Sequence, residues 1–110
     1  MPRSVAGWLR KFAAALAKGD LDAAGRLFGE ECYWRDLISF TWNIRTCEGR
    51  AEIHAMLAAT LAQTQPRAFN VLSRANKNEA WFSFETAVGR GTGHLRLKGG
   101  KGWTLLTTLQ

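Results

Sequence analysis

The hydrophobic periodicity of the sequence changes at Pro66, and this change limits the possible folds more than any other feature. Before Pro66, except for a hairpin pattern in residues 32–47, apolar residues recur every three or four positions, which is the spacing of helices with one buried face. After Pro66 they alternate with polar residues, as in the strands of a half-buried sheet. Helices followed by a run of strands predict an α+β domain, in which the helices pack on one face of an antiparallel sheet.

Three segments before Pro66 have the pattern of amphipathic helices. The first is expected to begin at a Ser4 N-cap and to end at Gly19, and a second, short helix begins at Asp20. The third covers residues 50–63. The residues expected to face the sheet from these helices are Val5, Trp8, Leu9, Phe12, Leu16, Leu21, Ala24, Leu27, Phe28, Ile53, Met56, Leu57 and Leu61.

Four segments after Pro66 have strand patterns, and turn residues separate them. The expected strands cover residues 68–75, 79–88, 94–98 and 103–110. The expected turns hold Asn76, Lys77 and Asn78 in the first case, Gly89, Gly91 and Gly93 in the second, and Gly99, Gly100 and Gly102 in the third.

The stretch CYWRDLISFTW, residues 32–42, places a carboxylate on an apolar face. If the stretch is a strand, Asp36 points to the same side as Trp34, and Tyr33 points to the other. Burial disfavours the charged form of a carboxyl group. A buried carboxyl group can therefore take up and release protons near neutral pH. The alternatives are that Asp36 binds a ligand or forms an ion pair with His54 or Arg45.

Residues 32–47 predict a β-hairpin that contains both cysteines. If Trp34, Asp36, Phe40 and Trp42 all face inward, the numbers of directly opposed residues sum to a constant even value. Cys32 and Cys47 would then point to opposite faces and stay reduced. Their positions do not have metal-ligand spacing, so no metal site is expected.

The quoted stretch and its flanks resemble the nuclear transport factor 2-like superfamily. The resemblance rests on FAAALAKGDLDAAGRLFGEECYWRDL, residues 12–37, and CEGRAEIHAML, residues 47–57. The superfamily includes ketosteroid isomerase, the SnoaL-like polyketide cyclases and many binding modules. The resemblance implies one domain over residues 1–110, with a cone-shaped fold in which three helices and a strongly curved antiparallel sheet enclose a pocket.

A closer likeness concerns the N-terminal accessory domain of FAD-dependent, flavin-monooxygenase-like oxidoreductases. The similar segments are YWRDLISFTWNIRTCEGR, FETAVGRGTGHLRL and GWTLLTTLQ. The segment GRGTGH, residues 89–94, is not a dinucleotide-binding fingerprint, because its spacing is wrong and no helix is expected after it. The likeness therefore implies an accessory domain that binds no flavin, and no cofactor is expected.

The resemblance also assigns site residues. Asp36 matches the catalytic aspartate of ketosteroid isomerase, whereas Phe12 stands where that enzyme has its oxyanion tyrosine and Gly93 lies at or beside the place of its second acid. Two functions stay open: a small-molecule-pocket or interaction domain, and a cofactor-free isomerase, cyclase or hydrolase with Asp36 as general base. The residues expected to line the pocket are Phe12, Trp34, Phe40, Trp42, His54, Phe82, Phe84 and Trp103.

Charge and exposure predict the partners. The formal net charge is +6, but the basic residues are scattered and form no nucleic-acid-binding motif, so no nucleic acid is expected. No apolar run approaches the ~20 residues of a membrane span, and a cytoplasmic protein without a membrane partner is expected. Trp81 falls on the outer face of the sheet, which favours a homodimer through that face. A small hydrophobic ligand is the other expected partner.

Overall fold

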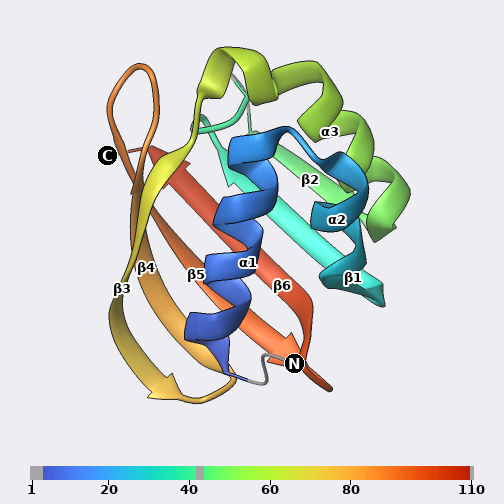
Figure 1. Ribbon diagram of the computed structural model, residues 1–110, viewed down its shortest axis with the longest axis vertical. Coiled ribbons are helices and arrows are strands. Elements are labelled where there is room, and N and C mark those ends of the chain that lie inside the picture. The colour runs from blue at the N-terminus through green and yellow to red at the C-terminus, as the bar shows by residue number, and fades with distance from the viewer. Residues whose placement is uncertain (1–3, 42–43, 110) are drawn as a thin grey trace.

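The computed structural model describes residues 4–41 and 44–109, and within them it places three helices against one six-stranded sheet (Figure 1). The elements follow in the order α1 (Val5–Lys18), α2 (Leu21–Arg26), β1 (Phe28–Leu37), β2 (Ile44–Glu48), α3 (Gly49–Thr64), β3 (Arg67–Asn76), β4 (Glu79–Glu85), β5 (Arg90–Lys98) and β6 (Lys101–Leu109). The α+β class expected from the change at Pro66 is confirmed. No described helix has the length and apolar character that crossing a membrane requires.

The helix ends follow the local capping rules. The Ser4 hydroxyl accepts a hydrogen bond from the amide of Gly7, and the Asp20 carboxylate accepts one from Ala23. Gly19 ends α1 in a left-handed conformation with φ of 67°. Phe28 differs from the prediction, since it begins β1 instead of extending α2. The amide of Gly102 donates to the carbonyl of Leu27, so the sheet hydrogen bonding starts directly after the helix.

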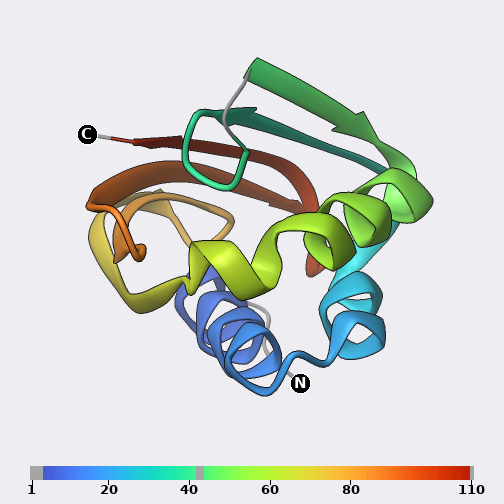
Figure 2. The same ribbon diagram turned by 90° about the horizontal axis from the view of Figure 1, so that it is seen from above.

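The sheet is curved, and all three helices lie on its concave side (Figure 2). Its strand order is β2-β1-β6-β5-β4-β3. Four of the strand pairings among the described residues are antiparallel, but β1 and β6 run parallel. The sheet is therefore mixed and not antiparallel throughout. The C-terminal strand lies in the middle of the sheet, where Thr107 is paired with Asp36.

The predicted register of the β1–β2 hairpin is wrong. Tyr33 is paired with Glu48 and Trp34 with Cys47, so the paired numbers sum to an odd value. Cys47 and Cys32 consequently point to the same side, and both are buried as free thiols. The even sum assumed that Phe40 belongs to the strand, whereas it lies in the loop after β1. Trp42 lies outside the described residues.

Two of the three glycines expected in the turn before residue 94 lie within β5, and only Gly89 lies in the turn. Gly91 is paired with Phe84 and Gly93 with Phe82 on β4. A Cβ atom on Gly93 would stand 2.2 Å from Cζ of Phe82, and one on Gly91 would stand 2.4 Å from Cζ of Phe84. Each ring thus lies across the backbone of the opposite strand. Because a side chain at that backbone position would collide with the ring, the position requires glycine.

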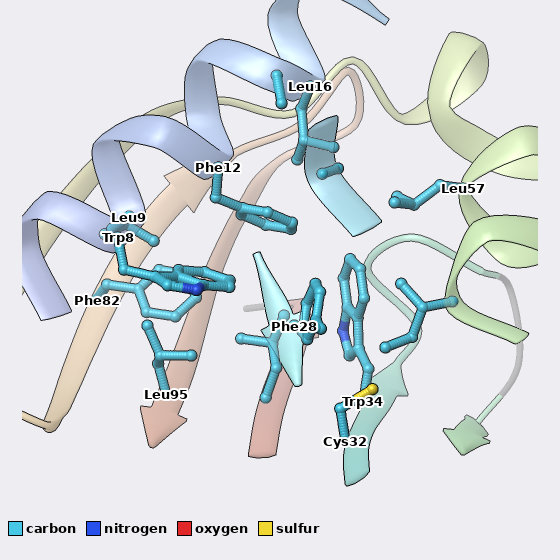
Figure 3. Packing of buried hydrophobic residues seen from close by; sticks show 14 of the residues in the cluster. Trp8, Leu9, Phe12, Leu16, Phe28, Cys32, Trp34, Leu57, Phe82 and Leu95 are labelled. Carbon is cyan, nitrogen blue, oxygen red and sulfur yellow. The ribbon is translucent and has the colours of Figure 1, made fainter. Parts of the chain in front are cut away.

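Aromatic rings fill the space between the helices and the sheet. Figure 3 shows Phe12 of α1, Phe28 and Trp34 of β1 and Phe82 of β4 converging there. Ring centroids of Phe12 and Trp34 are 5.7 Å apart, and those of Phe12 and Phe28 are 6.0 Å apart. Edge-to-face contacts of this kind add to the stability that burial provides.

Candidate functional site

Asp36 is a fully buried carboxylate that organises the loop after β1. Its Oδ2 atom accepts hydrogen bonds from the amides of Phe40, at 2.9 Å, and Thr41, at 2.8 Å, and from the Thr41 hydroxyl at 3.1 Å. Its Oδ1 atom accepts from the hydroxyls of Ser39 and Thr107. Five donors therefore converge on one side chain with 0% exposure.

A second connection ties this carboxylate to the centre of the sheet. Nε1 of Trp34 donates to the Thr107 hydroxyl at 2.8 Å, and that hydroxyl donates to Asp36 at 2.5 Å. The three side chains form a chain of hydrogen bonds across the parallel pairing of β1 and β6. Neither Arg45 nor His54 is among the hydrogen-bond partners of Asp36 within the described residues, so the ion pair considered for it does not form there.

The loop held by Asp36 contains an unusual backbone conformation. Ile38 has φ of 68°, in the left-handed region that β-branched residues rarely adopt. Ser39, Phe40 and Thr41, which follow it, all bond to the Asp36 carboxylate. These bonds hold the chain in a conformation that Ile38 alone would not favour.

Five of the seven Phe and Trp residues assigned to the pocket lie in the interior or in the loop beside it. Phe12, Trp34, Phe82 and Phe84 are buried in the core, and Phe40 is buried in the loop. Gly93, at the place assigned to a second acid, lies beneath the Phe82 ring.

His54 and Trp103, also assigned to the pocket, do not face the interior. His54 is half-exposed on α3, and its Nε2 atom lies 3.6 Å from a carboxylate oxygen of Asp22. Trp103 occupies an irregularity in the β5–β6 pairing, and its ring lies 5.5 Å from the Arg96 guanidinium and 5.3 Å from the Lys98 ammonium. Both cations are exposed on the outer side of β5, so Trp103 lies on the outer face of the sheet.

Asp36 lines none of the following three hollows at the surface of the described residues. A small one of about 30 Å³ lies beside the Asp36 loop and is lined by residues such as Ser39 and Phe40. One of about 730 Å³ lies between α1, α2 and the end of α3, with Leu57 and Leu61 in its wall. The third, of about 790 Å³, lies between α1 and α2, with Lys11 in its wall.

Sequence reasoning missed the hollow between α1 and α2. Lys11 and Lys18 are seven residues apart, and Trp8 and Ala15 share their side of the helix, which is the spacing of one helix face. This recurrence of lysines and apolar residues on one face of the helix was the sequence pattern that could have indicated the hollow.

The buried thiols are poor nucleophiles. Burial is the main influence on Cys32 and raises its pKa, although the positive charge of Arg50 opposes the rise. Burial likewise raises the pKa of Cys47, whose sulfur lies 3.8 Å from that of Met56. Among residues 4–41 and 44–109, no cluster of three or more His, Cys, Asp or Glu side chains could hold a metal ion.

Comparisons with known proteins agree with this fold. A comparison with curated protein sequences gives no match. The crystal structure of a proposed isomerase from Bacillus subtilis is 18% identical in sequence to this chain, with a TM-score of 0.73. The match covers 96% of this chain and 85% of that one. A protein from Sphaerobacter thermophilus is 12% identical with a TM-score of 0.78, covering 97% and 96%. A proposed ketosteroid isomerase from Kribbella flavida is 16% identical with a TM-score of 0.71, covering 94% and 76%.

The sequence itself matches a family profile over most of its length. The profile is that of the SnoaL-like domain, and the match covers residues 9–108. It includes all three helices except the start of α1. The chain therefore belongs to the SnoaL-like domain family.

Proposed function

We propose that this protein is a non-catalytic binding or interaction domain, related to the accessory domain of flavin-dependent monooxygenase-like oxidoreductases. As such a domain it acts by contact with a ligand or a partner and binds no flavin itself. One observation carries the proposal: both oxygens of Asp36, the best candidate for a catalytic base, are occupied by donors of the protein itself.

A general base needs a lone pair that points at the proton it removes. Oδ2 of Asp36 already accepts from two backbone amides and one hydroxyl, and Oδ1 accepts from two hydroxyls. The amides of Phe40 and Thr41 cannot turn away without a rearrangement of the loop. The carboxylate is thus used as a structural acceptor, which is the common role of a buried charge with several donors.

The surroundings of Asp36 support the same conclusion. Stabilisation of a developing oxyanion is usually the largest catalytic contribution in enolisation. Phe12 has no donor to offer, and the Phe82 ring leaves no room for a side chain at position 93. Neither position assigned to an oxyanion donor can therefore supply one.

The alternative function is a cofactor-free isomerase, cyclase or hydrolase that uses Asp36 as general base. It is favoured by the inward position of Asp36 on β1 and by the names of two structural neighbours, the proposed isomerases from Bacillus subtilis and Kribbella flavida. It requires the substrate to replace at least one of the donors now bound to Asp36.

An isomerisation assay separates the two functions. The protein, Asp36→Asn and the surface control Asp22→Asn are each incubated with a 5-ene-3-ketosteroid, and the conjugated product is followed by ultraviolet absorbance. A styrene oxide hydrolysis assay with the same three proteins covers the hydrolase. We expect rates equal to buffer for all three. Turnover that is lost in Asp36→Asn but kept in Asp22→Asn, with both variants folded, would establish the alternative.

A homodimer through the outer face of the sheet is part of the proposal. Trp81 on β4 is 48% exposed there and contacts the ring of His94 at a centroid distance of 4.6 Å. Glu79 lies beside them, 2.8 Å from His94 and 4.0 Å from Arg96. A face that carries an exposed indole and charges of both signs can complement a second copy of itself.

The remaining expectations complete the proposal. Two free, buried thiols are compatible with a reducing compartment, and we assign the protein to the cytoplasm on that basis. A small hydrophobic ligand is the expected partner. The groove between α1, α2 and the end of α3, with Leu57 and Leu61 in its wall, is the described surface that best matches such a ligand.

A further inference from the structure

The groove between α1 and α2 is surrounded by positive charge. We call it the basic groove. It runs beside α1 and α2 and is bordered by the β3–β4 turn and the β5–β6 turn. The cations in its wall are Lys11, Lys18, Arg26, Lys77 and Lys101.

These charges are not neutralised within the described part of the chain. Its ion pairs lie elsewhere, for example between Lys98 and Glu31, at 3.6 Å. Asp20 is the one described acid in the wall, and its carboxylate already caps α2 by accepting from the amide of Ala23. Like charges around one hollow repel one another, and an anion placed among them removes that repulsion.

Hydrogen bonds fix the side of the groove formed by β6 and α2. Nζ of Lys101 donates to the carbonyl of Arg26 at 2.9 Å, and Nε1 of Trp8 donates to the carbonyl of Leu27 at 2.7 Å. The amide of Gly102 donates to the same Leu27 carbonyl. One of the five cations is therefore held in position, whereas the others can turn toward a ligand.

Apolar residues also line the groove. Trp8, Ala14, Ala15, Ala23 and Leu27 contribute to it, and the single polar atom of the Trp8 side chain is already bonded. A volume of about 790 Å³ lies within the range of small-molecule sites. A wall that combines apolar residues with five cations matches a ligand with an apolar body and one anionic group.

We propose that the basic groove binds an amphipathic organic anion, such as an alkyl phosphate or a long-chain carboxylate. The proposal does not depend on the role of Asp36, because Asp36 lines no part of the groove. A nucleic acid is a poorer match, since its phosphates need cations along an extended track, and these five surround one concave site. The ligand is held by its charge against these cations and by its chain against the apolar residues of the wall.

The experiment is an NMR titration of the ¹⁵N-labelled full chain with octyl phosphate, inorganic phosphate and octanol. A groove variant carries Lys11→Gln, Lys18→Gln and Lys77→Gln. A matched control removes the same charge from exposed sites outside the groove, as Arg50→Gln, Arg74→Gln and Arg90→Gln. We expect octyl phosphate to shift the amides of Lys11, Lys18, Gly99 and Gly100, and to bind more tightly than inorganic phosphate or octanol.

The variants decide the outcome. The groove variant should bind octyl phosphate about tenfold more weakly, because three cations of the wall are lost, and the control should change less than about twofold. Equal weakening in both variants, shifts centred on another surface, or octanol binding as tightly as octyl phosphate would overturn the proposal. Tighter binding of duplex DNA or of phosphatidylglycerol vesicles, with the same amide shifts, would overturn it in favour of those partners.

Discussion

The hydroxyl of Thr107, on the last strand, donates a hydrogen bond of 2.5 Å to the carboxylate of Asp36, 71 positions earlier in the sequence. The same hydroxyl accepts from Nε1 of Trp34 at 2.8 Å. Thr107 thereby satisfies two buried polar groups of β1 at once. Because β1 and β6 are parallel and adjacent, this contact also fixes the register between the first strand and the last.

Thr107→Val should destabilise the protein by about 2 kcal/mol, because it leaves the Trp34 indole N–H without an acceptor and removes one donor from Asp36. Thr107→Ser keeps the hydroxyl and should lose about 1 kcal/mol or less. Urea unfolding followed by tryptophan fluorescence gives both values. Thr104→Val, on the outer face of the same strand, is the control and should change stability little. A Thr107→Val variant as stable as the parent protein would show that the hydroxyl contributes nothing to stability.

Asp36→Asn should destabilise the fold by about 3 kcal/mol at pH 7. The amide nitrogen that replaces one oxygen cannot accept hydrogen bonds, so at least two of the five donors lose their acceptor. Asp22→Asn, at an exposed position, should cost far less. The free energy of unfolding in urea is the measurement. A variant as stable as the parent protein would mean that the five donors contribute nothing, and the structural role of Asp36 would be rejected.

Gly93→Ala should cost about 2 kcal/mol, because its Cβ atom would stand 2.2 Å from Cζ of Phe82. Gly25→Ala should have the opposite sign and stabilise α2 by up to about 1 kcal/mol, since nothing lies within 4 Å of the added carbon. Thermal unfolding of both variants compares the signs directly. Gly93→Ala combined with Phe82→Leu should cost less than the sum of the two single changes, because the smaller side chain frees the space. Additive losses would argue against the contact.

The two cysteines make stability fall at high pH. Burial raises the pKa of Cys32 and of Cys47 above their values in the unfolded chain, so both thiols contribute fully below the unfolded pKa. As the pH rises further, the unfolded state loses its thiol protons first, and the contribution disappears through the folded pKa. The free energy of unfolding, measured from pH 7 to pH 10, should therefore decline more steeply in the parent protein than in the double variant Cys32→Ala, Cys47→Ala. Parallel curves would contradict the raised pKa values.

Trp81→Ala should convert the proposed dimer into a monomer, because truncation of a central interface tryptophan commonly costs 2 kcal/mol or more, roughly a thirtyfold loss of affinity. Light scattering coupled to size exclusion, at about 10 μM, measures the mass. Val88→Ala is the control, since Val88 is also exposed but follows the end of β4. A parent protein with the mass of one chain would refute the dimer through this face.

The sequence was sufficient for features that depend on neighbouring residues. Ser4, Gly19 and Asp20 marked the ends of the helices because a cap bonds to amides or carbonyls within a few positions. Alternation placed Asp36 and Trp34 on the buried side of β1 and Tyr33 on the other, as the structure has them. The α+β order followed from the change in periodicity at Pro66.

Only the tertiary structure decided which groups meet. The partners of Asp36 come from its own loop and from a strand 71 residues away, and no local pattern relates them. The sequence predicted Gly93 in a turn, whereas the structure pairs it with Phe82 within β5. The hairpin register failed because one inward residue, Phe40, belongs to a loop. The basic groove needs two helices and two turns, and its lysines lie from position 11 to position 101. Periodicity reports which side of an element is buried, whereas hydrogen-bond partners and grooves depend on how the elements are packed together.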